Sequence, residues 1–405
     1  MFFYFAVFLV IAVLCILSLR SRSKRRVFSV CIAVLLILIA GLKQPGVDFD
    51  SLGYVDFFNM TSQPLDYFTN FSEHYFSEVG YYLLCATLNN VLHTSVLWFF
   101  LIVALIAIPL KIAAIWRLTE FQLLSILIYF SHFFILHDMT QVRQGIASGI
   151  LLFSLPEIEK KNFLKFALLL CFGVLFHYSA LLFFPFYFLN TRKLNKPLFF
   201  AILIVPQILY LLRLNIISIL AMLNLGIISE KLNNYNELLQ YGLFTEINVY
   251  NAVVIIQLIF CSFLIWKSDF LQTKNKYAIL LIKIYTIGIG CWMLFYTVPV
   301  IAFRTSGFFE VVEIILVPFV LYYIEEKGMA IALIVLFGFA LLYIDVIHSA
   351  LMKPYAITNL FAYTGQRADN AVSNNVNTED DLCVSIKQQR GWKTQKFIIA
   401  KPEIS

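Results

Sequence analysis

Two arginines lie at the ends of apolar segments, where a cation could do chemistry. Arg143 opens the apolar segment Val142–Leu155, and Arg304 follows a second apolar segment at its end. A guanidinium offers forked hydrogen-bond donors that suit phosphate oxygens, so two arginines facing one cavity could bind a pyrophosphate without a metal. The alternatives are structural. Arg143 could anchor its helix by pairing with Asp138, and Arg304 could pair with Glu310, roughly 9 Å deeper along the same helix.

A histidine and a group of carboxylates could supply a base. His177 lies between the two apolar halves of Phe163–Leu189 and could accept a proton, or it could simply bond to the backbone as single histidines commonly do. The polar segment Lys43–Ser77 and the residues after it combine carboxylates with aromatic rings, a combination used in sugar binding. A solvated acidic loop is the alternative. The residues concerned are Asp48, Asp50, Tyr54, Glu78 and Tyr81.

The composition defines the elements that must position these groups. Of the 405 residues, 61% are hydrophobic and 13% are charged, whereas a soluble domain is about 45–50% apolar and about 25% charged. The apolar runs are unbroken over about 15–25 residues, which is the length of a membrane-spanning helix and lacks the alternation of a barrel strand. The sequence therefore predicts an all-α, polytopic integral membrane protein with about 10–12 transmembrane helices.

The charge pattern predicts a direction across the membrane. The net charge is +6, but the basic residues form short clusters between apolar runs, so they indicate topology and not a nucleic-acid partner. Cytoplasmic basic loops place both arginines, His177 and the acidic segment on the outer side. Phe163–Leu189 then reads as two short helices that turn near His177. Lys111 and Lys283, within about two turns of a cytoplasmic end, are expected to reach the interface by snorkelling.

The chain divides into a membrane domain and a polar tail. Residues 1–349 are predicted to form one multi-span domain with outer loops at about 43–77 and 213–248. Residues 350–405 are polar and rich in Ser and Asn, which is typical of a disordered tail. The cysteines are scattered and show no ligand spacing, so we expect neither a disulfide framework nor a zinc site.

Four short motifs follow one another in a recognisable order. They are Asp48 and Asp50 with Tyr54, Glu78-Val-Gly-Tyr81, Arg143-Gln144-Gly-Ile-Ala147, and Phe176-His177-Tyr-Ser179-Ala180. Together they resemble the EpsG family of bacterial polysaccharide-synthesis proteins, which is similar to the Wzy-type O-antigen and capsule polymerases. Arg304, followed by Phe308-Phe309, looks like the second arginine region of that family.

The resemblance implies a C-type membrane glycosyltransferase that acts at the periplasmic face of the bacterial inner membrane. It would transfer a growing chain from undecaprenyl pyrophosphate to the next undecaprenyl-pyrophosphate-linked oligosaccharide repeat unit, and so build O-antigen, capsule or exopolysaccharide. Arg143 and Arg304 would stabilise the departing pyrophosphate in place of a metal, and His177 or a carboxylate of the first outer segment would accept the proton. The predicted substrate-binding residues are Asp48, Asp50, Tyr54, Glu78, Tyr81, Gln144 and Glu310. The partners would be membrane lipid and a chain-length regulator protein, and no cofactor is expected.

Three other functions compete with polymerisation. One is a membrane O-acyltransferase, which would need a histidine near the inner face, whereas His177 is predicted at the outer end. An O-antigen ligase uses the same carrier-linked donor but transfers it to the lipid A core, and sequence order separates the two poorly. A lipid-linked oligosaccharide flippase would need two related halves and cations along the full depth of the bilayer. The suspect residues gather instead at the predicted outer ends of helices, which argues against a flippase.

Overall fold

The computed structural model describes residues 1–18, 21–69, 77–216, 248–348 and 352–358. Within these ranges the regular structure is helical, and β-pairing is limited to two isolated bridges. The all-α prediction is confirmed. Most of the predicted outer loop 213–248 and of the predicted tail lies outside the described residues.

The helices of the first half follow in chain order. They are α1 (Phe2–Ser18), α2 (Arg22–Gly41), α3 (Ser51–Met60), α4 (Asp66–Thr69), α6 (Val79–Ala86), η1 (Thr87–Val91), α7 (Val96–Leu118), α8 (Gln122–Ile128), η2 (Tyr129–Thr140) and α9 (Val142–Glu159). The second half contributes α10 (Phe163–Phe176), η3 (Tyr178–Phe188), α11 (Lys196–Leu211), α14 (Ala252–Trp266), α15 (Ser268–Lys274), α16 (Ala278–Leu294), α17 (Pro299–Glu310), α18 (Glu313–Leu316), η4 (Val317–Tyr322), α19 (Lys327–Tyr343) and η5 (Ile344–His348).

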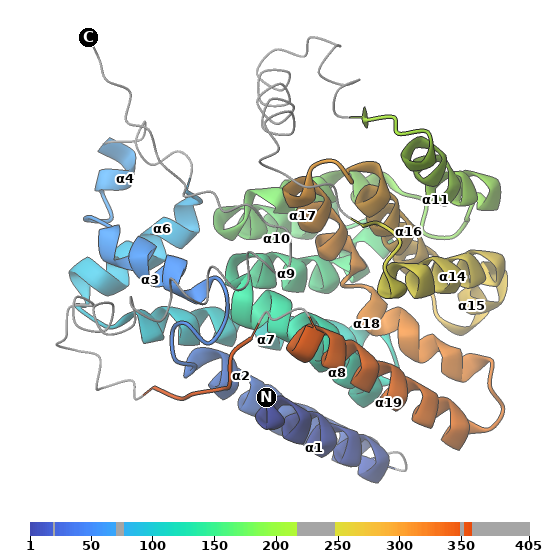
Figure 1. Ribbon diagram of the computed structural model, residues 1–405, viewed down its shortest axis with the longest axis horizontal. Coiled ribbons are helices and arrows are strands. Elements are labelled where there is room, and N and C mark those ends of the chain that lie inside the picture. The colour runs from blue at the N-terminus through green and yellow to red at the C-terminus, as the bar shows by residue number, and fades with distance from the viewer. Residues whose placement is uncertain (19–20, 70–76, 217–247, 349–351, 359–405) are drawn as a thin grey trace.

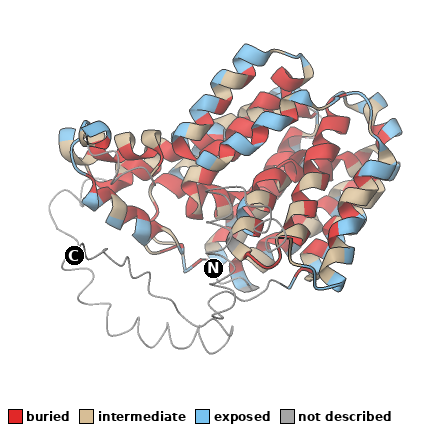
Figure 2. Cartoon of the chain, turned by 90° about the horizontal axis from the view of Figure 1, so that it is seen from above, coloured by how far each residue is buried: buried red, intermediate tan, exposed pale blue. Residues whose placement is uncertain are grey.

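Several of these helices are built to cross a membrane. Among the described residues, four stretches are long and apolar enough: Val96–Leu118, Gln122–Thr140, Ile301–Tyr322 and Lys327–Ile347. α14 and α15 would make a fifth crossing, bent by 74°. Shorter apolar helices such as α1 and α11 expose large side chains, among them Leu9, Ile16 and Ile204. Exposed positions recur along the outer helices in Figure 2. Apolar outer faces suit lipid, and the chain is an all-helical, polytopic membrane protein.

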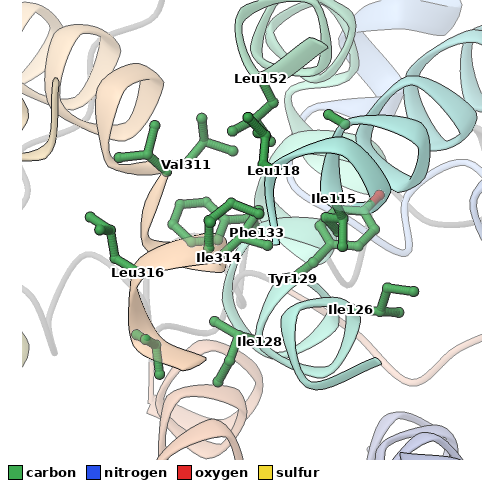
Figure 3. Close-up of a cluster of buried hydrophobic side chains, with 14 of the residues drawn as sticks. Ile115, Leu118, Ile126, Ile128, Tyr129, Phe133, Leu152, Val311, Ile314 and Leu316 are labelled. Atoms are coloured by element: carbon green, nitrogen blue, oxygen red, sulfur yellow. The ribbon is translucent and has the colours of Figure 1, made fainter. Parts of the chain in front are cut away.

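One core joins the two halves of the chain. α7 packs along α9 and α2, whereas α16 packs against α17 and α11 (Figure 1). Between these groups, Leu118 of α7, Phe133 of η2 and Ile314 of α18 converge in a cluster of buried side chains (Figure 3). Because interiors of this kind are close-packed, the cluster holds α9, which carries Arg143, in a definite position relative to α17, which carries Arg304.

The basic loops gather at one end of the molecule. Arg25 donates to the carbonyl of Glu120 at 3.0 Å, and Lys276 lies 3.8 Å from the carboxylate of Glu159. Asn275, beside Lys276, donates to the last residue of α7 at 2.7 Å. Loops that are far apart in the sequence therefore share one end, as the positive-inside rule requires for a single membrane face.

The predicted pair of short helices in Phe163–Leu189 is confirmed. α10 ends one residue before His177, whose backbone is extended, and η3 begins directly after it. Lys161 donates to the carbonyls of Tyr187 and Leu189, both at 3.0 Å. The chain therefore returns to the end from which α10 started, and His177 lies at the opposite turn.

The structure corrects the expected surroundings of Arg304. Arg304 lies inside α17 and not at the end of the preceding apolar segment, because the chain turns earlier and restarts a helix at Pro299. Proline is favoured in the first turn of a helix, where its missing N–H costs nothing. Glu310 ends α17 and Glu313 opens α18, so these two carboxylates do not share one continuous helix.

A short segment near the end of the described chain packs against the first outer loop. Residues 352–358 run antiparallel to the chain after α2, and the N–H of Lys353 donates to the carbonyl of Val47 at 2.7 Å. Tyr355 stacks on Phe3 with ring centroids 4.2 Å apart. The first residues assigned to the tail by sequence thus pack on the membrane domain, beside the loop that carries Asp48.

Candidate functional site

Glu78 lies at the centre of the candidate site and holds two other predicted residues. Its carboxylate is buried, and Oε2 accepts a hydrogen bond from Nη1 of Arg143 at 2.5 Å. The other oxygen, Oε1, lies 3.2 Å from Nδ1 of His177. Residues from the start of α6, the start of α9 and the turn after α10 therefore meet on one carboxylate.

The local sequence explains how these three residues meet. Glu78 is the N-cap of α6, and His177 is the C-cap of α10. Gly80 allows the two helices to approach, because a Cβ at this position would lie 2.9 Å from the carbonyl oxygen of Leu175. Arg143 is the second residue of α9, which begins directly after Gln141, the residue that ends η2.

The ionisation of Glu78 follows from these contacts. Burial alone raises the pKa of a carboxyl group. The hydrogen bond with His177 and the charge of Arg143 outweigh that effect and hold the pKa of Glu78 below its ordinary value. Glu78 is therefore an anion, and it fixes the positions of the Arg143 guanidinium and the His177 imidazole.

Arg143 lies on an aromatic surface with part of its side chain open to solvent. Its guanidinium carbon is 4.9 Å from the ring centroid of Tyr81 and 5.8 Å from that of Tyr54, and 31% of the side chain is exposed. Tyr81 is itself stacked on Phe57 at 4.5 Å. The rings orient the guanidinium by cation–π contact, while its exposed part remains available to an anion.

Asp50 is close enough to both Arg143 and Arg304 for each charge to affect its pKa. Arg304 is exposed and forms no ion pair within the described residues, so the expected Arg304–Glu310 pair is absent there. Burial and the neighbouring Asp48 raise the pKa of Asp50, whereas the charges of Arg143, Lys43 and Arg304 lower it and leave a net increase. The half-buried Asp50 thus lies within the fields of both arginines.

Asp48 is engaged within the fold. Its side chain is completely buried, with Oδ2 2.7 Å from Nζ of Lys43 and Oδ1 accepting the N–H groups of Asp50 and Ser51. Lys43 also donates to the carbonyl of Met139, and burial lowers the pKa of Lys43 against the opposing effect of Asp48. Both carboxylate oxygens of Asp48 thus already bond to groups of the protein, and we propose no substrate contact for this residue.

A buried ion pair behind the site was missed by sequence reasoning. Lys111 does not snorkel: it is fully buried and donates to Asp138 at 2.7 Å and to the carbonyl of Gly145 at 2.6 Å. Tyr129 donates to the same carboxylate at 2.5 Å. Asp138 therefore pairs with Lys111 and not with Arg143. The sequence did contain a signal for this pair. Lys111 and Asp138 are opposite charges in two apolar runs, and a charge in the membrane needs a partner.

Glu310 bonds to an amide and, among the described residues, not to an arginine. Its Oε2 accepts a hydrogen bond from Gln257 at 3.3 Å, and the same amide donates to Glu313 at 2.9 Å. Tyr285 also donates to Glu313, at 3.2 Å. Glu310 of α17 thus joins a polar cluster with residues of α14, α16 and α18.

The geometry provides a base and an anion site side by side. Nδ1 of His177 faces the anionic Glu78, which favours a proton on that nitrogen, and Nε2 is buried without a hydrogen-bond partner. Such an imidazole can accept a proton at Nε2. No group of His, Cys, Asp and Glu residues within the described part of the chain could hold a metal ion.

Gly80 offers a test of this packing. We expect Gly80→Ala to push α6 away from α10 and to separate Glu78 from His177, so the function of the protein should fall strongly. Overpacking of this kind also costs about 1–3 kcal/mol of stability. Gly53→Ala in α3 is the matched control, because its Cβ would meet nothing within 4 Å. The unfolding temperature of each purified variant measures the effect on packing, and equal unfolding temperatures for both variants would contradict it.

Fold and site together define a polytopic membrane protein with a glutamate-linked arginine and histidine near one end. A family model described as the EpsG family matches residues 26–357, and the chain belongs to that family. The resemblance predicted from the motifs is confirmed.

A curated relative and the solved structures complete the comparison. The chain is similar to the amylovoran biosynthesis protein AmsC of Erwinia amylovora, with 27% identity over 182 residues, 42% of this chain and 46% of the relative. The match thus spans less than half of the relative's length. No solved structure matches the chain.

Proposed function

We propose that this protein is a polysaccharide polymerase that joins lipid-linked oligosaccharide repeat units at the periplasmic face of the bacterial inner membrane. The observation that carries the proposal is the single carboxylate of Glu78, which holds Arg143 and His177 together. Membership of the EpsG family and similarity to an amylovoran biosynthesis protein support the same class of reaction. The basic loops at the opposite end support the periplasmic orientation.

The proposed reaction is a substitution at the anomeric carbon of the donor sugar. A hydroxyl oxygen at the non-reducing end of the acceptor unit forms the new glycosidic bond, and the bond from that carbon to the pyrophosphate oxygen breaks. The hydroxyl proton passes to Nε2 of His177, while Nδ1–H stays hydrogen-bonded to Glu78. Undecaprenyl pyrophosphate leaves as the anion, with its charge stabilised by Arg143 and Arg304.

The arginines suit this leaving group for different reasons. Arg143 is oriented by Glu78 and by the rings of Tyr54 and Tyr81, so little entropy is lost when it binds phosphate oxygens. Arg304 is exposed on α17, so its side chain is free to change rotamer and bind the pyrophosphate of the incoming carrier. Asp50, within the field of both, is a second candidate for the base, because a raised pKa brings a carboxyl group nearer to the working pH.

The arginine variants separate polymerisation from its competitors. In cells deleted for this protein, we expect Arg143→Ala to give single-repeat product without the long-chain ladder on a polysaccharide gel. Arg143→Lys keeps the positive charge but loses the paired N–H donors of the guanidinium, so it should restore little of the long-chain ladder. Arg192→Ala, an exposed arginine at the opposite end, is the control and should restore the full ladder.

Other outcomes would assign another function. A normal ladder from Arg143→Ala would contradict the role of that residue. Complete loss of polysaccharide from the lipid A core, with polymer still made on the carrier, would indicate a ligase. Repeat units retained on the inner leaflet of the deletion strain would indicate a flippase.

A further inference from the structure

A cavity of about 320 Å³ lies at the end of the molecule where the basic loops gather. Its wall includes Ser18 at the end of α1, Arg25 in the first turn of α2, Gln122 at the start of α8 and Lys327 at the start of α19. α8 packs against both α1 and α19 (Figure 1). Pockets for small ligands are typically about 300–1,000 Å³, so the cavity has room for a small polar group.

The cavity lies at the depth of a membrane surface. Two of the stretches that are long and apolar enough to cross a membrane, Gln122–Thr140 and Lys327–Ile347, begin with residues of its wall. The first residues of a spanning helix lie where the hydrocarbon ends and the lipid headgroups begin. The exposed Arg22, Lys24 and Arg26 lie in the first turns of α2 at the same level. In a bilayer, the groups nearest to the cavity are therefore lipid headgroups.

Two cations of the wall lack an acidic partner. Arg25 donates from Nη1 to the carbonyl of Glu120 at 3.0 Å and to Oε1 of Gln122 at 3.3 Å, and both acceptors are neutral. Its Nε is buried and, among the described residues, has no hydrogen-bond partner. Lys327 likewise donates to two backbone carbonyls. In the part of the chain that the structure describes, neither cation forms an ion pair, so each keeps donors and an uncompensated charge for a ligand.

The remaining wall favours an anionic lipid over a soluble anion. Leu123, Leu321 and Ile331 give it apolar surface beside the cations. A soluble phosphate would leave that surface in water, whereas the glycerol and acyl carbons next to a lipid phosphate would cover it. Among the described residues of the wall Glu120 is the one carboxylate, so two cations and one anion leave a net charge of +1. A headgroup with one negative charge balances it, and basic pockets between spanning helices suit such headgroups.

We propose that Arg25 and Lys327 bind the phosphate group of an anionic phospholipid in this cavity, with the glycerol and first acyl carbons against Leu123, Leu321 and Ile331. The bound lipid joins the end of α1 to the starts of α2, α8 and α19. Because it binds the folded protein and not the unfolded chain, it stabilises the fold. The site lies at the opposite end of the molecule from the candidate active site and does not depend on the proposed reaction.

Charge variants test the role of the two cations. Purified protein in a neutral detergent is titrated with phosphatidylglycerol, and the unfolding temperature gives the apparent Kd. We expect Arg25→Gln and Lys327→Gln each to raise this Kd about tenfold or more, because charge-assisted hydrogen bonds to the phosphate are lost. Lys327 is exposed, so Lys327→Gln leaves a folded protein to test if Arg25→Gln does not fold.

Arg26→Gln is the matched control. It makes the same change of charge on the neighbouring residue, whose guanidinium carbon lies 6.0 Å from the ring centroid of Trp116 and which does not line the cavity. Its Kd should equal that of the wild type.

Ile331→Trp tests the room in the cavity without changing a charge. The larger ring would occupy space beside Lys327, so the Kd for phosphatidylglycerol should rise. Leu336→Trp is the control, because Leu336 is exposed on the same helix and does not line the cavity. A wild-type Kd for Ile331→Trp would show that the lipid does not enter the cavity.

Three ligands identify the source of the phosphate. Phosphatidylglycerol should raise the unfolding temperature of the wild type. Phosphatidylcholine, which has no net charge, and inorganic phosphate, which has no acyl chain, should raise it far less. An equal shift from phosphatidylcholine, or one Kd shared by the Arg25, Lys327 and Arg26 variants, would overturn the site, since lipid would then coat the protein without using the two cations. An equal shift from inorganic phosphate would overturn the lipid in favour of a soluble anion.

Discussion

Lys111→Met is expected to lower the stability of the folded protein by about 3–5 kcal/mol, because it leaves a buried carboxylate without its cation. Both side chains of the Lys111–Asp138 pair are completely buried. After the substitution, the one side-chain donor left to Asp138 among the described residues would be the hydroxyl of Tyr129, at 2.5 Å. One neutral donor does not replace an ammonium group at 2.7 Å in a medium of low dielectric.

The double variant Lys111→Met with Asp138→Leu is the control. Replacing a whole buried ion pair by apolar residues is often neutral for stability, so the double variant should recover much of what the single variant loses. The unfolding temperature of purified protein in detergent measures both. A double variant no more stable than Lys111→Met would show that the pair is not the origin of the loss.

The same pair also affects the site. Lys111 donates to the carbonyl of Gly145, two residues after Arg143. Gly145 in turn allows the end of η2 to approach α9, since a Cβ there would overlap the carbonyl oxygen of His137. The ion pair thus fixes the start of α9 against the end of η2, and it determines where Arg143 and His137 lie.

The sequence predicted what depends on local pattern. Long apolar runs predicted helices, since apolar length and the need to satisfy backbone groups leave no other structure in lipid. Basic clusters on both sides of Phe163–Leu189 predicted the two short helices around His177. The motifs also singled out Arg143, His177 and Glu78, but they did not predict that the three side chains bond to one another.

Contacts between distant segments were beyond the reach of the sequence. The partner of Asp138 was misjudged because Arg143 is near it along the chain, whereas Lys111 approaches only when α7 packs on α9. Asp48 looks like a free acidic residue although Lys43 lies only five residues before it, because the sequence does not show that the pair is buried against the carbonyl of Met139. Burial decided both cases, and burial depends on tertiary packing.

His177→Phe is expected to reduce the polymerisation rate by about 10²–10⁴-fold, because a positioned base contributes that much to proton transfer. Nε2 of His177 is unpaired in the structure, so its loss breaks no hydrogen bond at that atom. Phenylalanine does remove the hydrogen bond between Nδ1 and the buried carboxylate of Glu78, which costs about 1–3 kcal/mol of stability, so the rate is measured on protein that its unfolding temperature shows to be folded. Initial rates in nanodiscs with lipid-linked repeat units measure the effect, and a rate within threefold of the wild type, on the order of 0.6 kcal/mol, would be too small for a base.

Glu78→Gln tests whether Glu78 positions His177 and Arg143. The amide group can donate to Nδ1 of His177, which favours the tautomer with its proton on Nε2 and so removes the base. We expect a loss approaching that of His177→Phe, and the double variant should be no slower than the worse single variant, since the two residues act as a unit. Fully additive losses would show that Glu78 and His177 act independently.

The difference in stability between the wild type and Glu78→Gln should also depend on pH in a defined sense. The pKa of Glu78 lies below its ordinary value in the folded protein, so its ion pair contributes stability that is fully present above the ordinary pKa. That contribution is lost as the pH falls through the lowered pKa. The wild type should therefore unfold at a higher temperature than Glu78→Gln at neutral pH, and the difference should shrink in acid. A difference that does not change with pH would mean that the charge of Glu78 does not hold Arg143 and His177 together.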